Sequence, residues 1–510
     1  MFTNKTFVTK WASAFLFLTF LAVGFSSCEK DDDTPTTTII VTCPGDVTSG
    51  TNDVSIAIPN VSGAVGNFTL TNDVTNISDA SGTYANGTTT VTYTVTDDTT
   101  GEVATCSFDV TVDNGLTIEE ETIGGTAFNK VTGSLTGNYT MTADKSWLIS
   151  GGIFVDAGAT LSIEAGTTIY AADDGATAFL AVQRGGKIMA EGTSTAPIVL
   201  TSIKSLDGIA GPGDWGGVII NGYATTNIGE GVGEGGTGTY GCDGSNCNDA
   251  DNSGVIRYVR VEYAGKILGT DNELNGFSFN GVGNGTTVEY IQAFSGSDDG
   301  IEFFGGTVNV KYAVSSGNED DSFDWTFGWS GNGQFWVAHQ FGVAGDRGLE
   351  ADNNGDDNTA SPYSNPTLSN ITLVGFDDGD GSNTGMRLRE GTKGKIYNAI
   401  VTGFPGNGIR VSNSDDDDAS TVTTDNMNNG ELVVANSVSA GNDTAWKDCD
   451  VFENDATNTT LAGMGGLNGY VGTIGENAKD PGTLGVWFSP ASFIGAVRST
   501  EDWTAGWTKQ

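Results

Sequence analysis

Short runs of alternating apolar and polar residues recur from about residue 130 onward, roughly every twenty residues, and glycines separate them. The run at 159–169, Ala-Thr-Leu-Ser-Ile-Glu-Ala-Gly-Thr-Thr-Ile, shows the pattern well, and related runs lie at 147–155, 185–193 and 197–201. Strict alternation is typical of a strand with one buried face. Repeats of this length bury those faces by stacking, with neighbouring strands ~4.8 Å apart. The pattern predicts an all-β solenoid, a parallel β-helix over residues 130–510 that ends in a C-terminal cap.

The repeat is sharpest in the middle of this region, where six segments can be superposed. Each consists of a turn residue, a small residue and an apolar–X–apolar strand. The segments are Asn275–Phe279, Asp299–Phe303, Asp321–Trp325, Arg347–Ala351, Thr384–Leu388 and Asn407–Val411. The blades of a β-propeller are longer and their strands alternate in direction. The spacing therefore favours a β-helix over a propeller.

Residues 37–113 form a separate pattern of short strands joined by turns. Alternation is clean in Thr90–Thr96, where one face is apolar or aromatic and the other is threonine. Strands are predicted at Ile39–Cys43, Val54–Ile58, Phe68–Thr71, Thr89–Thr96 and Cys106–Val112. Short strands at this spacing predict a small immunoglobulin-like β-sandwich. Residues 114–129 are then predicted to be a linker.

The first 27 residues have the pattern of an export signal. Two lysines precede an apolar run over 11–25, which is shorter than a membrane-spanning helix requires. The sequence Phe-Ser-Ser-Cys at 25–28 resembles the lipobox of bacterial lipoproteins, although Phe stands where Leu is usual, and it implies lipidation of Cys28. The acidic and Thr-rich tether 28–36 resembles the surface-export signal of Bacteroidetes lipoproteins. These resemblances imply a lipid-anchored outer-membrane protein that faces outward.

The charge of the chain excludes one class of partner. Acidic residues number 64 against 22 basic residues, which gives a formal net charge of −42. Nucleic-acid binding depends on Lys and Arg, so this balance argues against it. The balance also argues against direct attraction to anionic lipid or acidic polysaccharide. It favours divalent cations or cationic partners, or it serves solubility alone. The single histidine, His339, excludes a His-rich zinc site.

The six cysteines fit an exported chain. Cys43 and Cys106 bracket the strands of the predicted sandwich, and Cys242 and Cys247 enclose a short loop. Two disulfides are therefore expected if the protein leaves the cytoplasm. Cys449 is left without an obvious partner.

The predicted sandwich resembles an HYR-type repeat. The residues that carry the likeness are Val41–Pro44, Gly87–Asp97 and Ala104–Phe108. Such domains are adhesive spacers without catalysis, so the resemblance implies that this unit holds the larger domain away from the membrane.

Residues 130–510 resemble a family of Bacteroidetes surface proteins with a pectate-lyase-like right-handed β-helix. The motifs that carry this likeness are Gly166–Ile169, Gly213–Val218, Gly300–Gly306, Asp320–Trp325 and Asp502–Trp507. The resemblance implies the fold. It implies little about activity, because β-helices host many functions.

Candidate chemistry lies at the central X positions of the six segments, which point outward from the predicted β-helix. In order these residues are Ser278, Glu302, Asp324, Glu350, Arg387 and Arg410. The preceding turns add Asp298, Asp299, Glu319, Asp320 and Asp321. Carboxylates stacked ~5 Å apart repel one another, so they bind a metal ion, share protons or spread into water. We predict a calcium site formed by Asp298, Asp299, Glu302, Asp320, Asp321 and Asp324, and a catalytic or ligand-binding set of Glu302, Asp324, Glu350, Arg387 and Arg410.

Two enzyme families share the predicted fold. The pair Asp298-Asp299 is similar to the aspartate pair of polygalacturonase-type glycosidases, but the Gly-His-Gly and Arg-x-Lys motifs of that family are missing from this sequence. A pectate-lyase type of reaction would use calcium on the carboxylates and a basic residue, for which Arg387, Arg389 and Arg410 are candidates by position.

The sequence thus predicts a surface lipoprotein that binds extracellular glycan or matrix, with calcium stabilising its loops. One alternative is a polysaccharide-degrading enzyme, either a lyase or a glycoside hydrolase. Another is a purely structural adhesin. An enzyme would need an acid, a base and a groove that excludes water.

Overall fold

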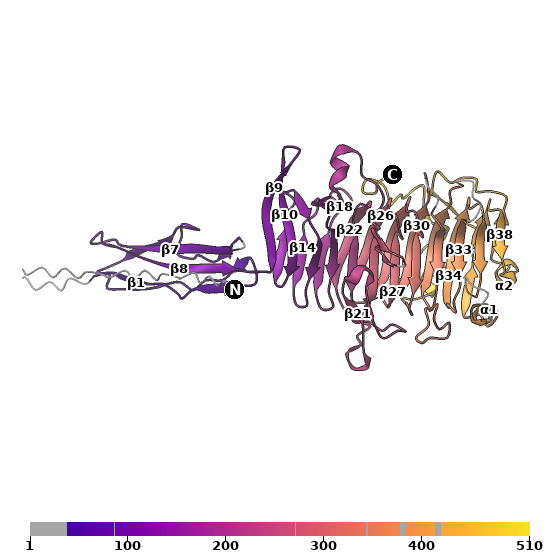
Figure 1. The fold of residues 1–510 in the computed structure, drawn as a ribbon, viewed down its shortest axis with the longest axis horizontal. Helices are drawn as coiled ribbons and strands as arrows, with labels where there is room; N and C mark the ends of the chain where they lie inside the picture. Colours follow the sequence, from indigo (N-terminus) through magenta and orange to yellow (C-terminus); the bar gives the residue numbers. More distant parts are fainter. Residues whose placement is uncertain (1–37, 86, 271, 343–344, 378–382, 414–419) are drawn as a thin grey trace, which may run out of the picture.

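The computed structural model describes residues 38–510, apart from 86, 271, 343–344, 378–382 and 414–419. The predicted signal peptide, Cys28 and the tether lie outside the described residues. Figure 1 shows a small group of strands near the start of this range and a long stack of strands after it. No described helix combines the length and apolar character needed to cross a bilayer.

The first described unit is a small β-structure. A four-stranded sheet has the order β2-β8-β7-β5, and the pairs β1–β4 and β3–β6 accompany it. The strands are β1 (Ile40–Thr42), β2 (Val47–Ser49), β3 (Asp53–Val54), β4 (Asn60–Ser62), β5 (Phe68–Asn72), β6 (Gly82–Thr83), β7 (Gly87–Asp97) and β8 (Val103–Val112). A disulfide joins Cys43 to Cys106. The strand predicted at Val54–Ile58 is wrong beyond Val54, because Ile58 is exposed and precedes Pro59, which cannot donate to a ladder.

The segment predicted as a linker is instead part of the β-helix. Strand β9 (Leu116–Ile123) pairs antiparallel with β10 (Thr126–Leu135), which in turn pairs in parallel with β12 and β13. Leu116, Phe128 and Val131 are buried. The hairpin therefore covers the first edge of the solenoid, which would otherwise expose unpaired backbone groups.

The rest of the chain forms a parallel β-helix, as predicted. Its main sheet has 23 strands, and a second parallel sheet has the order β31-β33-β35-β38. The coils are built from β11 (Asn138–Met141), β12 (Trp147–Ile149), β13 (Gly152–Val155), β14 (Thr160–Ile163), β15 (Thr168–Ala171), β16 (Phe179–Val182), β17 (Lys187–Glu191), β18 (Ile198–Ser202), β19 (Val218–Asn221), β22 (Gly254–Glu262), β25 (Phe277–Val282), β26 (Thr287–Phe294), β27 (Ile301–Gly306), β28 (Asn309–Ser316), β29 (Phe323–Thr326), β30 (Asn332–His339), β31 (Arg347–Ala351), β32 (Thr367–Val374), β33 (Thr384–Leu388), β34 (Gly394–Thr402), β35 (Asn407–Val411), β36 (Leu432–Ala435), β37 (Val438–Ala440), β38 (Thr444–Lys447) and β39 (Thr459–Leu461).

Aromatic side chains fill the interior of the central coils. Phe303 stacks on Phe279, with ring centroids 5.5 Å apart, and on Trp329 at 4.2 Å. Phe323 stacks on Trp336 at 4.7 Å. All five rings are fully buried. Since β-helix rungs repeat at ~4.8 Å, the ring spacing follows the rung spacing, and the stack fixes which residues of each strand point inward.

Two hairpins project from the stack beside the central coils. The first joins β20 (Glu230–Val232) to β21 (Thr239–Gly241), and the second joins β23 (Ile267–Gly269) to β24 (Asn272–Glu273). The backbone N–H of Gly235 donates to Asn272 Oδ1 at 2.7 Å, which ties the hairpins together. A disulfide joins Cys242 to Cys247 directly after β21.

A ladder of bends runs along one side of the coils, where each long strand of the main sheet turns a corner. The register places one residue with positive φ on each of seven successive coils, and we call these residues the corner ladder. They are Tyr258, Tyr290, Tyr312, Phe335, Asn370, Asn398 and Asn436. The left-handed conformation is uncommon for large residues, so its recurrence marks a fixed bend in each coil.

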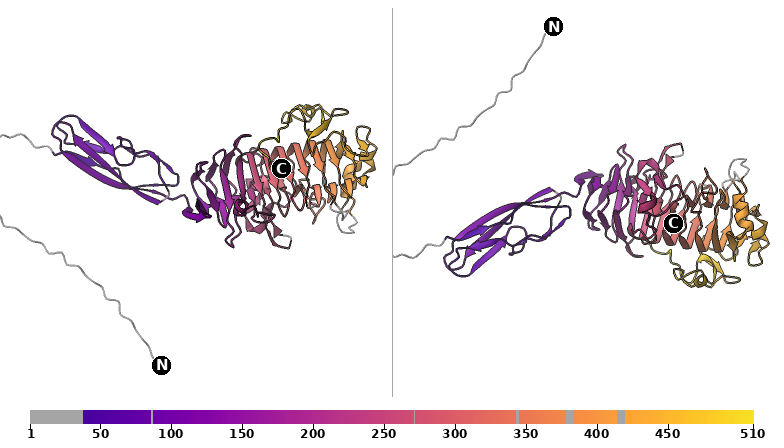
Figure 2. Two further views of the ribbon diagram at one scale, coloured as in Figure 1. Left: turned by 90° about the horizontal axis from the view of Figure 1, so that it is seen from above. Right: turned by 90° about the horizontal axis from the view of Figure 1, so that it is seen from below.

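The C-terminal segment lies along this side of the β-helix instead of capping its end. Residues 468–510, here called the strap, contain β40 (Gly472–Ile474) and β41 (Ile494–Val497) and place the C-terminus beside the middle coils (Figures 1 and 2). Asn436 Nδ2 donates to the backbone oxygen of Asn477, and Trp507 packs edge-on against Tyr258. The cap predicted at the end of the solenoid is therefore misplaced; helices α1 (Val422–Asn428) and α2 (Asp450–Glu453) lie near the last coils.

Candidate functional site

The outward X positions form one row of charged side chains, which we call the charged ladder. Strand register pairs Ser278 with Glu302 and Glu302 with Asp324. In the second half it pairs consecutive members of the series Glu350, Arg387, Arg410 and Lys447. Two backbone bonds link these halves, from Ser322 N to Arg347 O and from Asp352 N to Trp325 O. The ladder therefore runs along one face, from carboxylates to cationic groups.

The carboxylates of the ladder do not spread into water, which was one of the three interpretations of its sequence, whereas Lys447 at the cationic end is exposed. Glu302 is 8% exposed, Glu350 is 7% exposed and Arg387 is 9% exposed. Buried carboxylates need a proton, a hydrogen-bond donor or a positive partner, because isolated buried charge is costly. The burial leaves metal binding and proton sharing as the open interpretations.

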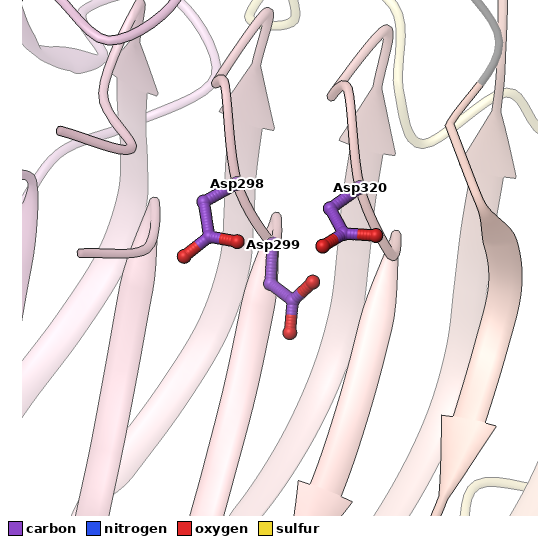
Figure 3. Close-up of side chains that lie close together, drawn as sticks. All are labelled: Asp298, Asp299 and Asp320. Atoms are coloured by element: carbon purple, nitrogen blue, oxygen red, sulfur yellow. The ribbon is translucent and has the colours of Figure 1, made fainter. Parts of the chain in front are cut away.

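The turns before β27 and β29 bring further carboxylates to the acidic end of the ladder. Asp298 and Asp320 lie at equivalent turns of adjacent coils, and Asp299, which follows Asp298 in the turn before β27, lies between them (Figure 3). Three groups of carboxylates have oxygen atoms that all lie within 4.8 Å of one another. These groups are Asp298–Asp299–Asp320, Asp299–Glu302–Asp324 and Asp320–Asp321–Asp346. We call these seven residues the acidic cluster.

Burial and mutual repulsion raise the pKa values of this cluster. Burial, followed by the charge of Asp320, raises the pKa of Asp298 to about 8. Burial and the neighbouring Asp324 raise the pKa of Glu302 well above its usual range. Burial, then Asp321, does the same for Asp299. The cluster therefore favours positive charge, supplied either by protons or by metal ions.

Arginines neutralise the carboxylates next to the acidic cluster. Arg389 forms ion pairs with Glu350 and with Asp352, the latter at 2.9 Å. Arg347 pairs with Asp346 and, at 2.8 Å, with Glu350. The ladder thus has a neutralised middle between its acidic end and the cationic end.

The two projecting hairpins bound the acidic end. Glu234, in the turn after β20, has its pKa raised to about 7, first by burial and then by the charges of Glu273 and Asp324. Tyr240 of β21 has its pKa raised by burial and then by Glu302. The ring of Tyr240 also packs against Phe304 of β27, with centroids 6.2 Å apart, so this hairpin lies against the coil that carries Glu302.

The structure brings the six residues predicted to bind calcium into the acidic cluster. Glu350 and Arg387 lie next along the ladder, and Arg410 lies one rung beyond Arg387. Glu319, from the same predicted turns, is exposed. The sequence predicted Arg389 only as a candidate base and did not predict that Arg389 forms ion pairs. It also missed other members of the site, namely Asn275, Asp346, Arg347, Asp352, Glu234 and Lys447.

Hollows elsewhere on the molecule do not involve the ladder. One of about 570 Å³ includes Arg184 and Tyr223 in its lining, and another of about 870 Å³ includes Tyr84 and Tyr139. Neither of these two is lined by a ladder residue.

The fold and the ladder together define a parallel β-helix protein with a row of charged side chains along one face. The chain belongs to the family described as the pectate-lyase like beta helix domain, whose model matches residues 133–508. No curated protein matches the chain in sequence. A solved structure, the periplasmic alginate epimerase AlgG, is similar at 9% identity and a TM-score of 0.23, over 66% of this chain and 85% of that chain. The family fits a protein that acts on or binds polysaccharide.

Proposed function

We propose that the protein binds extracellular polysaccharide along the charged ladder, with calcium held among the carboxylates of its acidic end. The observation that carries this proposal is the register of the ladder, which sets one charged or polar side chain on each rung. Rungs repeat at ~4.8 Å, a spacing close to the length of one sugar unit. A linear chain lying along the ladder would meet a new side chain at each unit.

The two ends of the ladder supply different contacts. Calcium at the acidic end would present a positive charge to hydroxyl or carboxylate oxygens of a sugar. Arg410 and Lys447, at the other end, would donate hydrogen bonds to acid groups or hydroxyls. With calcium bound, a net charge of −42 no longer prevents the local binding of an acidic polymer.

The remainder of the chain would hold the β-helix at a distance from the membrane. The predicted lipid on Cys28 would anchor the chain to the outer membrane, and the tether with the small N-terminal β-unit would act as an HYR-like spacer. The β-helix would then reach extracellular glycan or matrix.

Retention on polysaccharides tests the proposal. The chain from residue 29 onward, which keeps all described residues, is passed through gels containing neutral or acidic polysaccharides, with calcium or with chelator. We expect retention that depends on calcium. The variant Arg410→Gln should weaken this retention, and the control variant Arg498→Gln, which removes an exposed arginine, should leave it unchanged. An absence of retention on every polymer would leave the structural adhesin as the better account.

A lyase is the second candidate, favoured by the state of Arg387. Burial, then the charges of Arg347 and Arg389, lowers the pKa of Arg387 to about 10. A neutral guanidine could take the proton next to a uronate carboxyl, after which the linked sugar leaves and a double bond remains. Mass analysis of the incubated polymers separates the two functions. Unsaturated fragments that disappear in Arg387→Ala would establish a lyase, and intact polymer would establish binding alone.

A further inference from the structure

We propose that the acidic cluster binds two divalent cations that share the Asp299 carboxylate as a bridging ligand. The first cation lies with Asp298 and Asp320, and the second lies with Glu302 and Asp324. This inference deepens the proposed function and rests on it for the role of the cations, but their number and their shared ligand follow from the cluster itself.

The geometry of the carboxylates matches two adjoining sites. Calcium takes oxygen ligands at ~2.3–2.6 Å, so two ligands of one ion lie no more than about 5 Å apart. Asp298, Asp299 and Asp320 each offer an oxygen within 4.8 Å of the others, and Asp299, Glu302 and Asp324 do the same. Asp299 belongs to both groups. Its Oδ1 also accepts a hydrogen bond from the backbone N–H of Asp321 at 2.9 Å, which fixes the orientation of the carboxylate.

The third group of carboxylates already has a positive partner. Arg347 forms an ion pair with Asp346, and its Nη1 lies 4.0 Å from Asp321 Oδ1. Among the ion pairs of the described residues, none is formed by Asp298, Asp299, Asp320, Glu302 or Asp324. Two divalent cations would reduce the charge of these five carboxylates from −5 to −1. One cation would leave −3 in a buried site, which is far more costly.

The neutral side chain of Asn275 is independent evidence for a ligand at the group formed by Asp299, Glu302 and Asp324. Asn275 is 1% exposed, and its Nδ2 donates to Glu302 Oε2 at 2.6 Å. Its Oδ1 is buried and accepts no hydrogen bond from the described residues. Oδ1 of Asp324 is likewise buried without a donor. Buried oxygens without donors are rare, and a cation would satisfy both. Turning over the Asn275 amide would present its oxygen to the ion bound by Glu302.

The donor set selects the kind of cation. All of the groups named are carboxylate or amide oxygens, which suit a hard cation. Calcium tolerates irregular arrangements of such ligands, whereas magnesium requires a near-ideal octahedron. Calcium is therefore the expected ion, and manganese is a suitable probe that prefers the same oxygens.

Calcium titration without any polysaccharide tests the inference. Isothermal titration on the chain from residue 29 onward should give two ions per chain. Asp320→Asn and Asp324→Asn should each retain one ion, because each removes a ligand of one site. Asp299→Asn should lose tight binding at both sites, and Glu453→Gln, which removes an exposed carboxylate of helix α2, should still bind two ions.

A crystal of the unaltered protein soaked with manganese provides a measurement that does not depend on the folding of variants. Two anomalous peaks on either side of Asp299 are expected. A single peak, or an Asp299→Asn variant that loses no more calcium than Asp320→Asn, would overturn the shared-ligand arrangement. Two ions without polysaccharide retention would refute the proposed function alone, and calcium-dependent retention by a protein that binds only one ion per chain would refute this inference alone.

Discussion

Removing divalent cations should destabilise the β-helix measurably at neutral pH. A ligand present at one hundred times its dissociation constant stabilises the folded state by about 2.7 kcal/mol, so two sites contribute about 5 kcal/mol. The unfolding entropy of about 2.1 cal/mol/K per residue, taken over residues 133–508, amounts to about 0.8 kcal/mol/K. The melting temperature should therefore fall by about 7 °C when chelator replaces calcium.

In chelator, the raised pKa of Asp298 also predicts the direction in which stability changes with pH. The pKa of Asp298 is raised from 3.8 to about 8 in the folded chain, so the folded chain binds more protons than the unfolded chain between these values. Stability must then fall as the pH rises from about 4 to about 8. Calcium takes the place of those protons, so its presence should flatten the profile.

Thermal unfolding followed by tryptophan fluorescence, with calcium and with chelator at several pH values, is a sufficient assay. Asp299→Asn serves as the informative variant, since it removes one repelling charge and one shared ligand. It should melt at a higher temperature than the unaltered protein in chelator and gain less from calcium. Equal melting temperatures with calcium and chelator at pH 7.5, or stability that increases with pH in chelator, would refute the reasoning.

Three further predictions concern the framework. Arg389→Ala should cost about 3–5 kcal/mol in denaturant unfolding, because it removes the ion-pair partner of buried Asp352 and one of the two arginines paired with Glu350, whereas Arg498→Ala at an exposed pair should cost less than about 1 kcal/mol. Trp507→Ala should cost about 3–5 kcal/mol, because the ring is fully buried between the strap and the coils, and Trp487→Ala, at a partly exposed position, should cost less in the same assay. Removing the disulfide of the N-terminal unit, which closes a separation of 63 residues, should destabilise that unit by about 4 kcal/mol by differential scanning calorimetry.

The β-helix and the position of the charged ladder could be predicted because a period of two residues fixes which side chains face inward. Phe303 and Trp325 occupy the apolar positions of their segments and are fully buried, as the pattern predicts. Once those faces are fixed, stacking in register must place Glu302 over Asp324. The alternating pattern of each segment was therefore sufficient to predict both the buried core residues and the row of charged residues outside the core.

The burial of the ladder could not be predicted in the same way. It depends on hairpins such as the one that carries Glu234, and on ion pairs such as Arg389 with Asp352, whose partners are 37 residues apart. The repeat pattern along the sequence does not predict contacts between residues that lie this far apart. The repeat is recognisable only from about residue 130, so it gives no sign that the segment 114–129 belongs to the β-helix, where Leu116 and Phe128 are buried.

The strap changes how the rod should respond to force. A solenoid whose units touch only their neighbours yields one coil at a time when its ends are pulled. Here Asn477 contacts Asn436, Phe493 contacts Asn370, and Trp507 contacts Tyr258, so one segment spans seven coils. Those coils form a mechanical block that must release together, and the block includes the coils that carry the acidic cluster. The acidic cluster would thus keep its shape when the rod is under tension.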